Sequence, residues 1–324
     1  MAKSIIDVYS MLFSTAIALE ASAYPKPGNV HRLHDYPDKK YEDYIVTSIV
    51  VEKYFRKALL RGMKLGTCRC KTLFCDIVRE AVLDTLCFTG GRNTSLGTIF
   101  LLTPLALATG YILSSGDTID IHKLASTATL VVEKYSTVDD SIEYYRVLRV
   151  IKPSYLRKTD ETHGYPNIHD RSFKKKLVEK NIRLWELLIY ASTKDVVAKQ
   201  IVDNYRDCID ALKFMEKRLE SHGDWNRGVV ETYLYMLSRL NDTIVMLKHG
   251  ANVMDYVKRR AASILEEILS RDNEWMSLVA VLDNELYTKR INPGSIADLV
   301  ACVIALKKIS DENILHCLLE KKIH

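Results

Sequence analysis

Apolar residues recur every three or four positions along most of the chain. In the first segment they stand at Ile5, Val8, Leu12, Ala16 and Leu19. This spacing predicts an amphipathic helix that ends near the proline pair at positions 25 and 27. The same criterion predicts helices at 42–61, 72–88, 95–113, 119–134, 138–149, 173–192, 195–220, 228–248, 252–270, 274–287 and 295–307.

No alternating apolar and polar run bounded by hairpin turns stands out, so a sheet is not expected. No Ser-rich linker divides the chain, and no repeat with a period of 20 to 50 residues is present. The pattern therefore predicts an all-α fold, with one large multi-helix bundle domain over residues 1–324. We expect the functional loops to lie at one end of this bundle, since chemistry commonly resides in loops on a rigid frame.

One stretch is apolar enough to raise the question of a membrane. From Asn93 to Gly116 the chain contains no charged residue, and this length is sufficient to span a bilayer. The stretch also contains Pro104 and Gly110, and no second stretch like it occurs. We therefore expect a buried core helix and no membrane partner.

Composition narrows the class of protein. The chain has 324 residues, of which 48% are apolar and 27% are charged, and its mean hydropathy is -0.07. These values are typical of a soluble globular protein. The net charge of +5 is spread along the chain and does not indicate a nucleic-acid partner, whereas an anionic small ligand suits it.

The cellular setting can also be predicted. The start of the chain lacks the apolar segment and cleavage site of a signal peptide, so we expect a cytoplasmic protein. Seven cysteines, an odd number, argue against a disulfide framework. The single glutamine, Gln200, among many Lys, Glu and Tyr residues suggests a thermophilic source.

The segment after the first helix has the composition of an anion-binding loop. Lys26, His31 and Arg32 supply positive charge, and Gly28 permits close approach of the backbone. A solvated turn punctuated by prolines is the structural alternative. Asp35 offers a carboxylate for Mg²⁺, which prefers carboxylate and phosphate oxygens; Asp38 and Asp43 are further candidates for the same ion.

A glycine-rich turn precedes the uncharged helix. Gly90 and Gly91 lead to Asn93, Thr94 and Ser95, at a predicted helix start where free N–H groups and the helix dipole favour an anion. The turn lacks the pattern of a Walker loop. Simple N-capping by the three polar side chains is the alternative.

Two later segments carry weaker signals. Asp242 and His249 are seven residues apart, so they share one face of a helix that also carries Lys248. An ordinary surface helix explains this pattern equally well. Ser295 follows a Pro-Gly turn as a helix cap, and Asp298 follows as an acid matched to the helix dipole.

Three of these segments, taken together, carry a family resemblance. They are EASAYPKPGN at Glu20–Asn29, GRNTSLG at Gly91–Gly97 and NPGSIADLVA at Asn292–Ala301. In this order and separation they resemble the triphosphoribosyl-dephospho-CoA synthase family, and the match spans nearly the whole chain. Further segments similar to the family are Tyr145-Arg146, Leu148-Arg149, Asp195 in STKDVVAKQ, and Asp242-Thr243 with Lys248-His249-Gly250.

The chain also departs from the family pattern. Ser95 stands where the transferases usually have a histidine, Asn29 replaces an aliphatic residue, and no GAH-x-DMD segment follows the first loop. In these respects the chain is similar to the archaeal branch. The resemblance implies transfer of the triphosphoribosyl group of ATP to the ribose 2′-hydroxyl of 3′-dephospho-CoA, with release of adenine.

The resemblance also suggests roles for the residues singled out above. Glu20 would polarise the acceptor hydroxyl or stabilise developing positive charge, and it is a catalytic candidate together with Asp35 and Asp242. Asp35 and Asp242 would hold Mg²⁺. The residues expected to bind ATP or its phosphates are Lys26, Gly28, Asn29, His31, Arg32, Asn93, Thr94, Ser95, Lys248 and Ser295.

Two alternative functions stay open at this point. The dipeptides His34-Asp35 and His169-Asp170 match the HD pair of helical metal-dependent phosphohydrolases, so a nucleotide hydrolase, or a transferase with another acceptor, is one. A catalytically silent nucleotide-binding protein is the other, favoured by Ser95 in place of the histidine. The expected partners are ATP and a CoA-like acceptor, and a homodimer is a candidate assembly.

Overall fold

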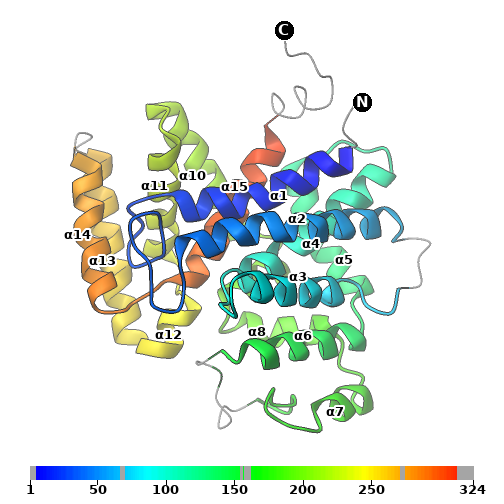
Figure 1. Ribbon diagram of the computed structural model, residues 1–324. Coiled ribbons are helices and arrows are strands. Elements are labelled where there is room, and N and C mark those ends of the chain that lie inside the picture. The colour runs from blue at the N-terminus through cyan, green and yellow to red at the C-terminus, as the bar shows by residue number, and fades with distance from the viewer. Residues whose placement is uncertain (1–4, 66–69, 154–155, 157–161, 271–273, 312–324) are drawn as a thin grey trace.

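The computed structural model describes residues 5–65, 70–153, 156, 162–270 and 274–311. Within these ranges the chain forms fifteen α-helices and no β-strand, which confirms the all-α class (Figure 1). The helices are α1 (Ile5–Ser22), α2 (Tyr41–Met63), α3 (Cys75–Phe88), α4 (Leu96–Ser114), α5 (Ile121–Tyr135), α6 (Val138–Ile151), α7 (Phe173–Glu179), α8 (Leu184–Ser192), α9 (Val196–Val202), α10 (Arg206–His222), α11 (Trp225–Arg239), α12 (Thr243–His249), α13 (Ala251–Ser270), α14 (Trp275–Thr288) and α15 (Gly294–Ser310).

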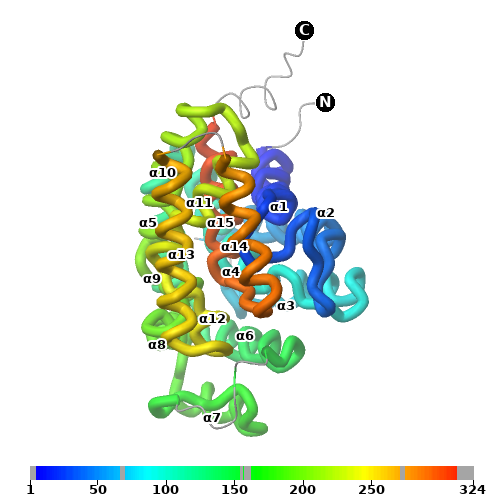
Figure 2. The backbone as a smooth tube through the Cα atoms, turned by 90° about the vertical axis from the view of Figure 1, so that its left-hand side faces the viewer, coloured from blue at the N-terminus to red at the C-terminus, as the bar shows by residue number. Residues whose placement is uncertain are grey.

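Helices α4 and α15 form the centre of the bundle. Every residue of α4 from Thr98 to Gly110 is buried, and α15 is buried over most of its length. A helix that is apolar on all sides is a core helix, and these two contact each other as well as α1 and α9. Figure 2 shows α13 and α14 side by side along one face of the molecule.

The uncharged stretch predicted as a core helix is α4. By length and composition, α1 and α4 are the two described helices able to cross a membrane. Most of the apolar window of α4, 78% of it, is buried inside the structure. The expectation of a buried helix is therefore confirmed for α4.

Helices α2 and α4 approach each other closely at two glycines. A Cβ atom added to Gly62 would lie 2.0 Å from the carbonyl oxygen of Leu107, and one added to Gly110 would lie 2.0 Å from that of Leu59. Each glycine therefore contacts the backbone of the opposite helix. The two glycines therefore allow α2 and α4 to pack with their backbones in contact.

Three segments predicted as single helices are each two helices. The break in 173–192 contains Asn181, with a φ of 49°, and the break in 195–220 contains Asn204 and Tyr205, with φ of 52° and 54°. A positive φ cannot continue a right-handed helix. The third, 228–248, is interrupted before Asp242, whose side chain caps α12. The third break creates the start of α12, which contributes Ile244 to the cavity described below.

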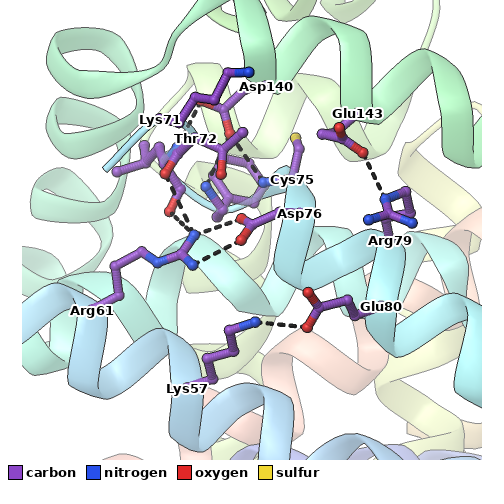
Figure 3. A network of polar contacts seen from close by, with 12 residues as sticks. Lys57, Arg61, Lys71, Thr72, Cys75, Asp76, Arg79, Glu80, Asp140 and Glu143 are labelled. Atoms are coloured by element: carbon purple, nitrogen blue, oxygen red, sulfur yellow. Dashed lines mark hydrogen bonds and ion pairs between the residues drawn. The ribbon is translucent and has the colours of Figure 1, made fainter. Parts of the chain in front are cut away.

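One buried carboxylate joins α3 to α6. Asp140 Oδ1 accepts the backbone N–H groups of Phe74 and Cys75, both at 3.0 Å, and Oδ2 accepts that of Leu73 at 2.8 Å. Figure 3 shows Asp140 above the first turn of α3. The first turn of α3 is thus capped by a residue of another helix.

Candidate active site

A cavity of about 110 Å³ lies where the first turns of α4, α9 and α15 meet α1 and the loop before α2. Its polar lining residues are Glu20, Asn29, Lys39, Tyr44, Asn93, Thr94, Ser95, Thr98, Asp195, Asn292, Ser295 and Asp298. Its apolar lining includes Ile17, Phe100, Tyr144, Leu148, Val197 and Ala198. The first turns of α4 and α15 lie at the cavity, and the positive end of a helix dipole favours anions.

Two polar side-chain atoms at the cavity have no partner. Ser95 Oγ and Asn292 Oδ1 are buried, and neither has a hydrogen-bond partner within the described part of the chain. Buried polar atoms are nearly always hydrogen-bonded in proteins, so an orphan at a cavity suggests a ligand. Ser95 is also the N-cap residue of α4, but its side chain makes no capping hydrogen bond.

The carboxylate of Asp298 connects α15 to the start of α4. Its Oδ1 accepts the backbone N–H of Thr98 at 2.9 Å and the hydroxyl of the same residue at 2.5 Å. The pKa of Asp298 is raised to about 7, chiefly by burial and also by the negative charge of Glu20, while the hydrogen bond from Thr98 opposes the shift. Asp298 is therefore near half-protonation at neutral pH, which suits a residue that exchanges protons.

Glu20 and Lys26 form a buried ion pair at the base of the cavity. The Lys26 ammonium bonds the Glu20 carboxylate and, at 3.0 Å, the Glu20 backbone oxygen. Lys26 is completely buried. Burial raises the pKa of Glu20 and lowers the pKa of Lys26, while the attraction between the two charges opposes both shifts.

Lys39 is the cation that lines the cavity. Burial lowers its pKa, and the nearby positive charge of Lys248 lowers it further, whereas Asp38 and Asp298 oppose these effects. Lys248 itself is exposed near the C-terminal end of α12. Two lysines are thus close enough to interact at this side of the cavity.

Asp283 of α14 binds the loop that carries Asn29 and Lys39. Asp283 Oδ1 accepts the N–H of Gly28 at 3.0 Å, and Asp283 Oδ2 lies 3.0 Å from His31 Nε2 and 2.9 Å from His34 Nδ1. Leu33 donates its N–H to His31 Nδ1, so Nε2 of His31 carries the proton and donates to Asp283. A metal ion at these three side chains would require the other tautomer of His31.

Comparison with known proteins now identifies the family. The model of the ATP:dephospho-CoA triphosphoribosyl transferase family matches residues 7–315. This chain belongs to that family.

Two known proteins are similar to this chain over most of its length. A probable 2-(5''-triphosphoribosyl)-3'-dephosphocoenzyme-A synthase of Citrobacter koseri is 22% identical over 333 residues, covering 97% of this chain and 94% of that protein. The crystal structure of a candidate triphosphoribosyl-dephospho-CoA synthase from Archaeoglobus fulgidus shares the fold, with a TM-score of 0.56. Its sequence is 23% identical, and the match covers 80% of this chain and 96% of the other.

The cavity is lined by six of the residues that the sequence of this transferase family member predicted for the site. They are Glu20, Asn29, Asn93, Thr94, Ser95 and Ser295. They come from α1, the first loop, the glycine-rich turn and the start of α15. Segments far apart in the sequence are thus brought to one place, although their individual roles stay predictions.

The other predicted residues lie outside the cavity lining. They are Lys26, Gly28, His31, Arg32, Asp35, Asp242 and Lys248. The ammonium of Lys26 is directed at Glu20, and His31 is bound to Asp283. Arg32 donates from Nε to the backbone oxygen of Ser22. All three side chains thus make contacts within the protein, and their phosphate-binding roles stay predictions.

The two carboxylates predicted to hold Mg²⁺ have other partners. Asp35 is exposed and accepts the N–H of Tyr41 at 2.8 Å. Asp242 is completely buried, and its two oxygens accept the N–H groups of Val245 and Ile296 at 2.8 and 2.9 Å. Asp242 thereby caps α12 and joins it to α15. The structure does not bring Asp35 and Asp242 together at the cavity.

Sequence reasoning did not assign a role at the site to several lining residues. Lys39, Tyr44, Asp195, Asn292 and Asp298 belong to this group. Both aspartates stand at helix starts, where an acid is usually explained as a cap or as a match to the helix dipole. The available signal was that they occur in segments similar to the family.

Proposed function

We propose that this chain transfers the triphosphoribosyl group of ATP to dephospho-CoA in the cavity between α1, α4 and α15. Membership of the transferase family supports the reaction. The position of Asp298 supports this location of the active site, because a carboxylate with a pKa of about 7 lines the cavity beside the helix starts. This is the observation on which the proposal chiefly depends.

The triphosphate would bind at the side of the cavity where Lys39 lies. The positive ends of the helix dipoles of α4 and α15 would attract phosphate oxygens, and Lys39 adds a cation. The cavity of about 110 Å³ is smaller than the roughly 300–1,000 Å³ of typical ligand pockets. Part of the substrate would therefore extend outward past Lys39 toward Lys248.

The transfer exchanges one bond at the ribose C1′ for another. The C1′–N9 bond breaks and its electron pair leaves with adenine, while the acceptor hydroxyl oxygen bonds to C1′. Asp298 would accept the proton of that hydroxyl, and the carboxylate of Glu20 would stabilise positive charge developing at C1′. Both side chains line the cavity, and the charge of Glu20 raises the pKa of Asp298.

We also propose that Mg²⁺ enters with the triphosphate. When bound, the ion would neutralise phosphate charge, and it prefers oxygen ligands together with substrate phosphates. The unpartnered Oδ1 of Asn292 is a suitable donor at the cavity. Asp242 is less suitable because both of its oxygens already accept backbone hydrogen bonds.

Incubation of the chain with ATP, Mg²⁺ and 3′-dephospho-CoA tests the proposal. We expect adenine release that depends on the acceptor, and a product whose mass equals dephospho-CoA plus one triphosphoribosyl group. Adenine released equally well without dephospho-CoA would support the hydrolase or another acceptor instead. Tight ATP binding with no adenine release under any acceptor would support the catalytically silent protein.

A further inference from the structure

The cavity lining contains two groups of residues with different chemistry. One group, which we call the charged end, includes Glu20, Lys39 and Asp298. The charge of Glu20 raises the pKa of Asp298 and that of Lys39 lowers it, while Asp298 raises the pKa of Lys39. The charges of Glu20 and Asp298 also raise the pKa of Tyr44, which is chiefly raised by burial. These four residues line the cavity together and are electrostatically coupled.

The other group, which we call the aromatic end, is formed by residues of α4, α6 and α9. Phe100 and Tyr144 stack there with ring centroids 4.8 Å apart and planes inclined by 28°. Phe100 is 3% exposed, whereas Tyr144 is half-buried and lines the cavity beside Leu148 and Val197. A flat heterocycle stacks favourably on such a ring.

The influences on the pKa of Asp195 differ from those at the charged end. Burial raises its pKa, and the opposing influences are the backbone N–H groups of Ala198 and Val197; no charged side chain of the described residues contributes. Ala198 and Val197 also line the cavity. Asp195 is thus a carboxyl group in an apolar setting, which favours its protonated form.

We propose that the aromatic end holds the adenine of ATP against Tyr144, and that Asp195 donates a proton to this adenine as it leaves. This inference rests on the proposed transferase function. It assigns the nucleotide a direction in the cavity, with the base toward α6 and α9 and the triphosphate toward Lys39.

The proton inventory is balanced in this arrangement. The electron pair of the C1′–N9 bond goes to the adenine ring, which takes the proton of the Asp195 carboxyl group. The acceptor hydroxyl gives its proton to Asp298 as its oxygen bonds to C1′. One acid in the aromatic end and one base in the charged end thus serve the leaving group and the nucleophile.

Dephospho-CoA also contains adenine, so the test must separate the two substrates. Equilibrium binding is measured for ATP, inorganic tripolyphosphate and dephospho-CoA with wild type and Tyr144→Leu. We expect Tyr144→Leu to weaken ATP about tenfold and to leave the other two unchanged. Tyr235→Leu, which removes the ring stacked on Phe214 at 4.2 Å away from the cavity, is the matched control.

The proton donor is tested with Asp195→Asn. Asparagine keeps the helix cap, which Asp195 now makes to Ala198 N–H at 2.8 Å, but cannot transfer a proton. We expect single-turnover adenine release to fall about 100-fold or more with ATP affinity unchanged. Asp120→Asn, at the cap of α5, should leave the rate unaltered.

The outcomes distinguish this inference from the function on which it rests. Equal loss of ATP and tripolyphosphate binding in Tyr144→Leu, or no loss of ATP binding, overturns the adenine site. Weakening of dephospho-CoA alone assigns the ring to the acceptor and also overturns it. Wild-type adenine release by Asp195→Asn overturns the proton donor. A wild-type chain that neither binds ATP nor releases adenine overturns the proposed function itself.

Discussion

Gly97 on α4 lies directly against the carboxylate of Asp298 on α15. A Cβ atom at Gly97 would be 2.0 Å from Asp298 Oδ2. Gly97→Ala should therefore displace Asp298 from its place at the cavity. Because a displacement of about 1 Å can cost roughly 100-fold in rate, we expect a loss of that order in kcat/KM for adenine release.

Gly110→Ala is the control on the same helix. A methyl group there would meet the backbone oxygen of Leu59, at the contact with α2, and not a residue of the cavity. We expect this variant to lower the unfolding temperature, while its folded fraction keeps its activity. Full activity in Gly97→Ala would show that the position of Asp298 does not limit the reaction.

Asp298 predicts the pH dependence of the reaction. Its pKa of about 7 means that the carboxylate is protonated below neutral pH and ionised above it. A base must be ionised to accept a proton, so kcat/KM should rise with pH through about 7. Asp298→Asn should lower kcat/KM by about 100- to 10,000-fold and remove this limb of the profile. A limb that persists in the variant would belong to another group.

The ion pair of Glu20 and Lys26 predicts a stability effect. Lys26→Met leaves the Glu20 carboxylate buried without its cation, and breaking a buried pair in this way costs about 3–5 kcal/mol. Urea denaturation should show a loss of that order in the free energy of unfolding. The double variant with Glu20→Gln should recover much of it.

An exposed pair provides the comparison. Lys53 lies 2.7 Å from Asp84, but its side chain is 60% exposed. Lys53→Met should therefore change the free energy of unfolding by less than about 1 kcal/mol. Equal effects at the two sites would contradict the importance assigned to burial of Lys26.

Asp242 predicts how stability varies with pH. Burial raises its pKa to about 6, above the value of about 3.9 in an unfolded chain. Between these values the folded state holds a proton that the unfolded state has released, so the free energy of unfolding decreases as pH rises from about 4 to 6. This decrease amounts to roughly 3 kcal/mol.

Asp242→Asn separates this effect from capping. The amide is uncharged at every pH, so the decline of stability between pH 4 and 6 should become shallower. The amide accepts through one oxygen, which leaves the N–H of Val245 or Ile296 without its present acceptor and lowers stability throughout by about 1–3 kcal/mol. An unchanged slope, measured by urea denaturation at several pH values, would contradict the shifted pKa.

The positions of the helices were easier to predict from the sequence than the side chains that line the site. The periodicity predicted α4 and α15 within a few residues, because apolar spacing reports burial directly. It joined α9 to α10 because the left-handed conformation of Asn204 and Tyr205 depends on tertiary contacts and leaves no clear trace in the spacing.

Residues of the candidate site were predictable where the signal lies within one short loop. Asn93 and Ser95 follow two glycines at a helix start, and both line the cavity. Asp298 was predicted as an acid that matches its own helix dipole, whereas its carboxylate accepts hydrogen bonds from Thr98, 200 residues away. Tertiary packing decides which helix accepts the contacts of an aspartate side chain. The spacing of residues along a single helix does not reveal this packing.

The capping of α3 by Asp140 has a consequence for how the chain folds. The N–H groups of Leu73, Phe74 and Cys75 bond to a carboxylate that is 65 to 67 residues further along the chain. The first turn of α3 therefore acquires its hydrogen-bond acceptor only after α6 has been synthesised and has docked. In a nascent polypeptide that ends before residue 138, this turn should fray, and its amides should exchange hydrogen faster than those at the middle of the same helix.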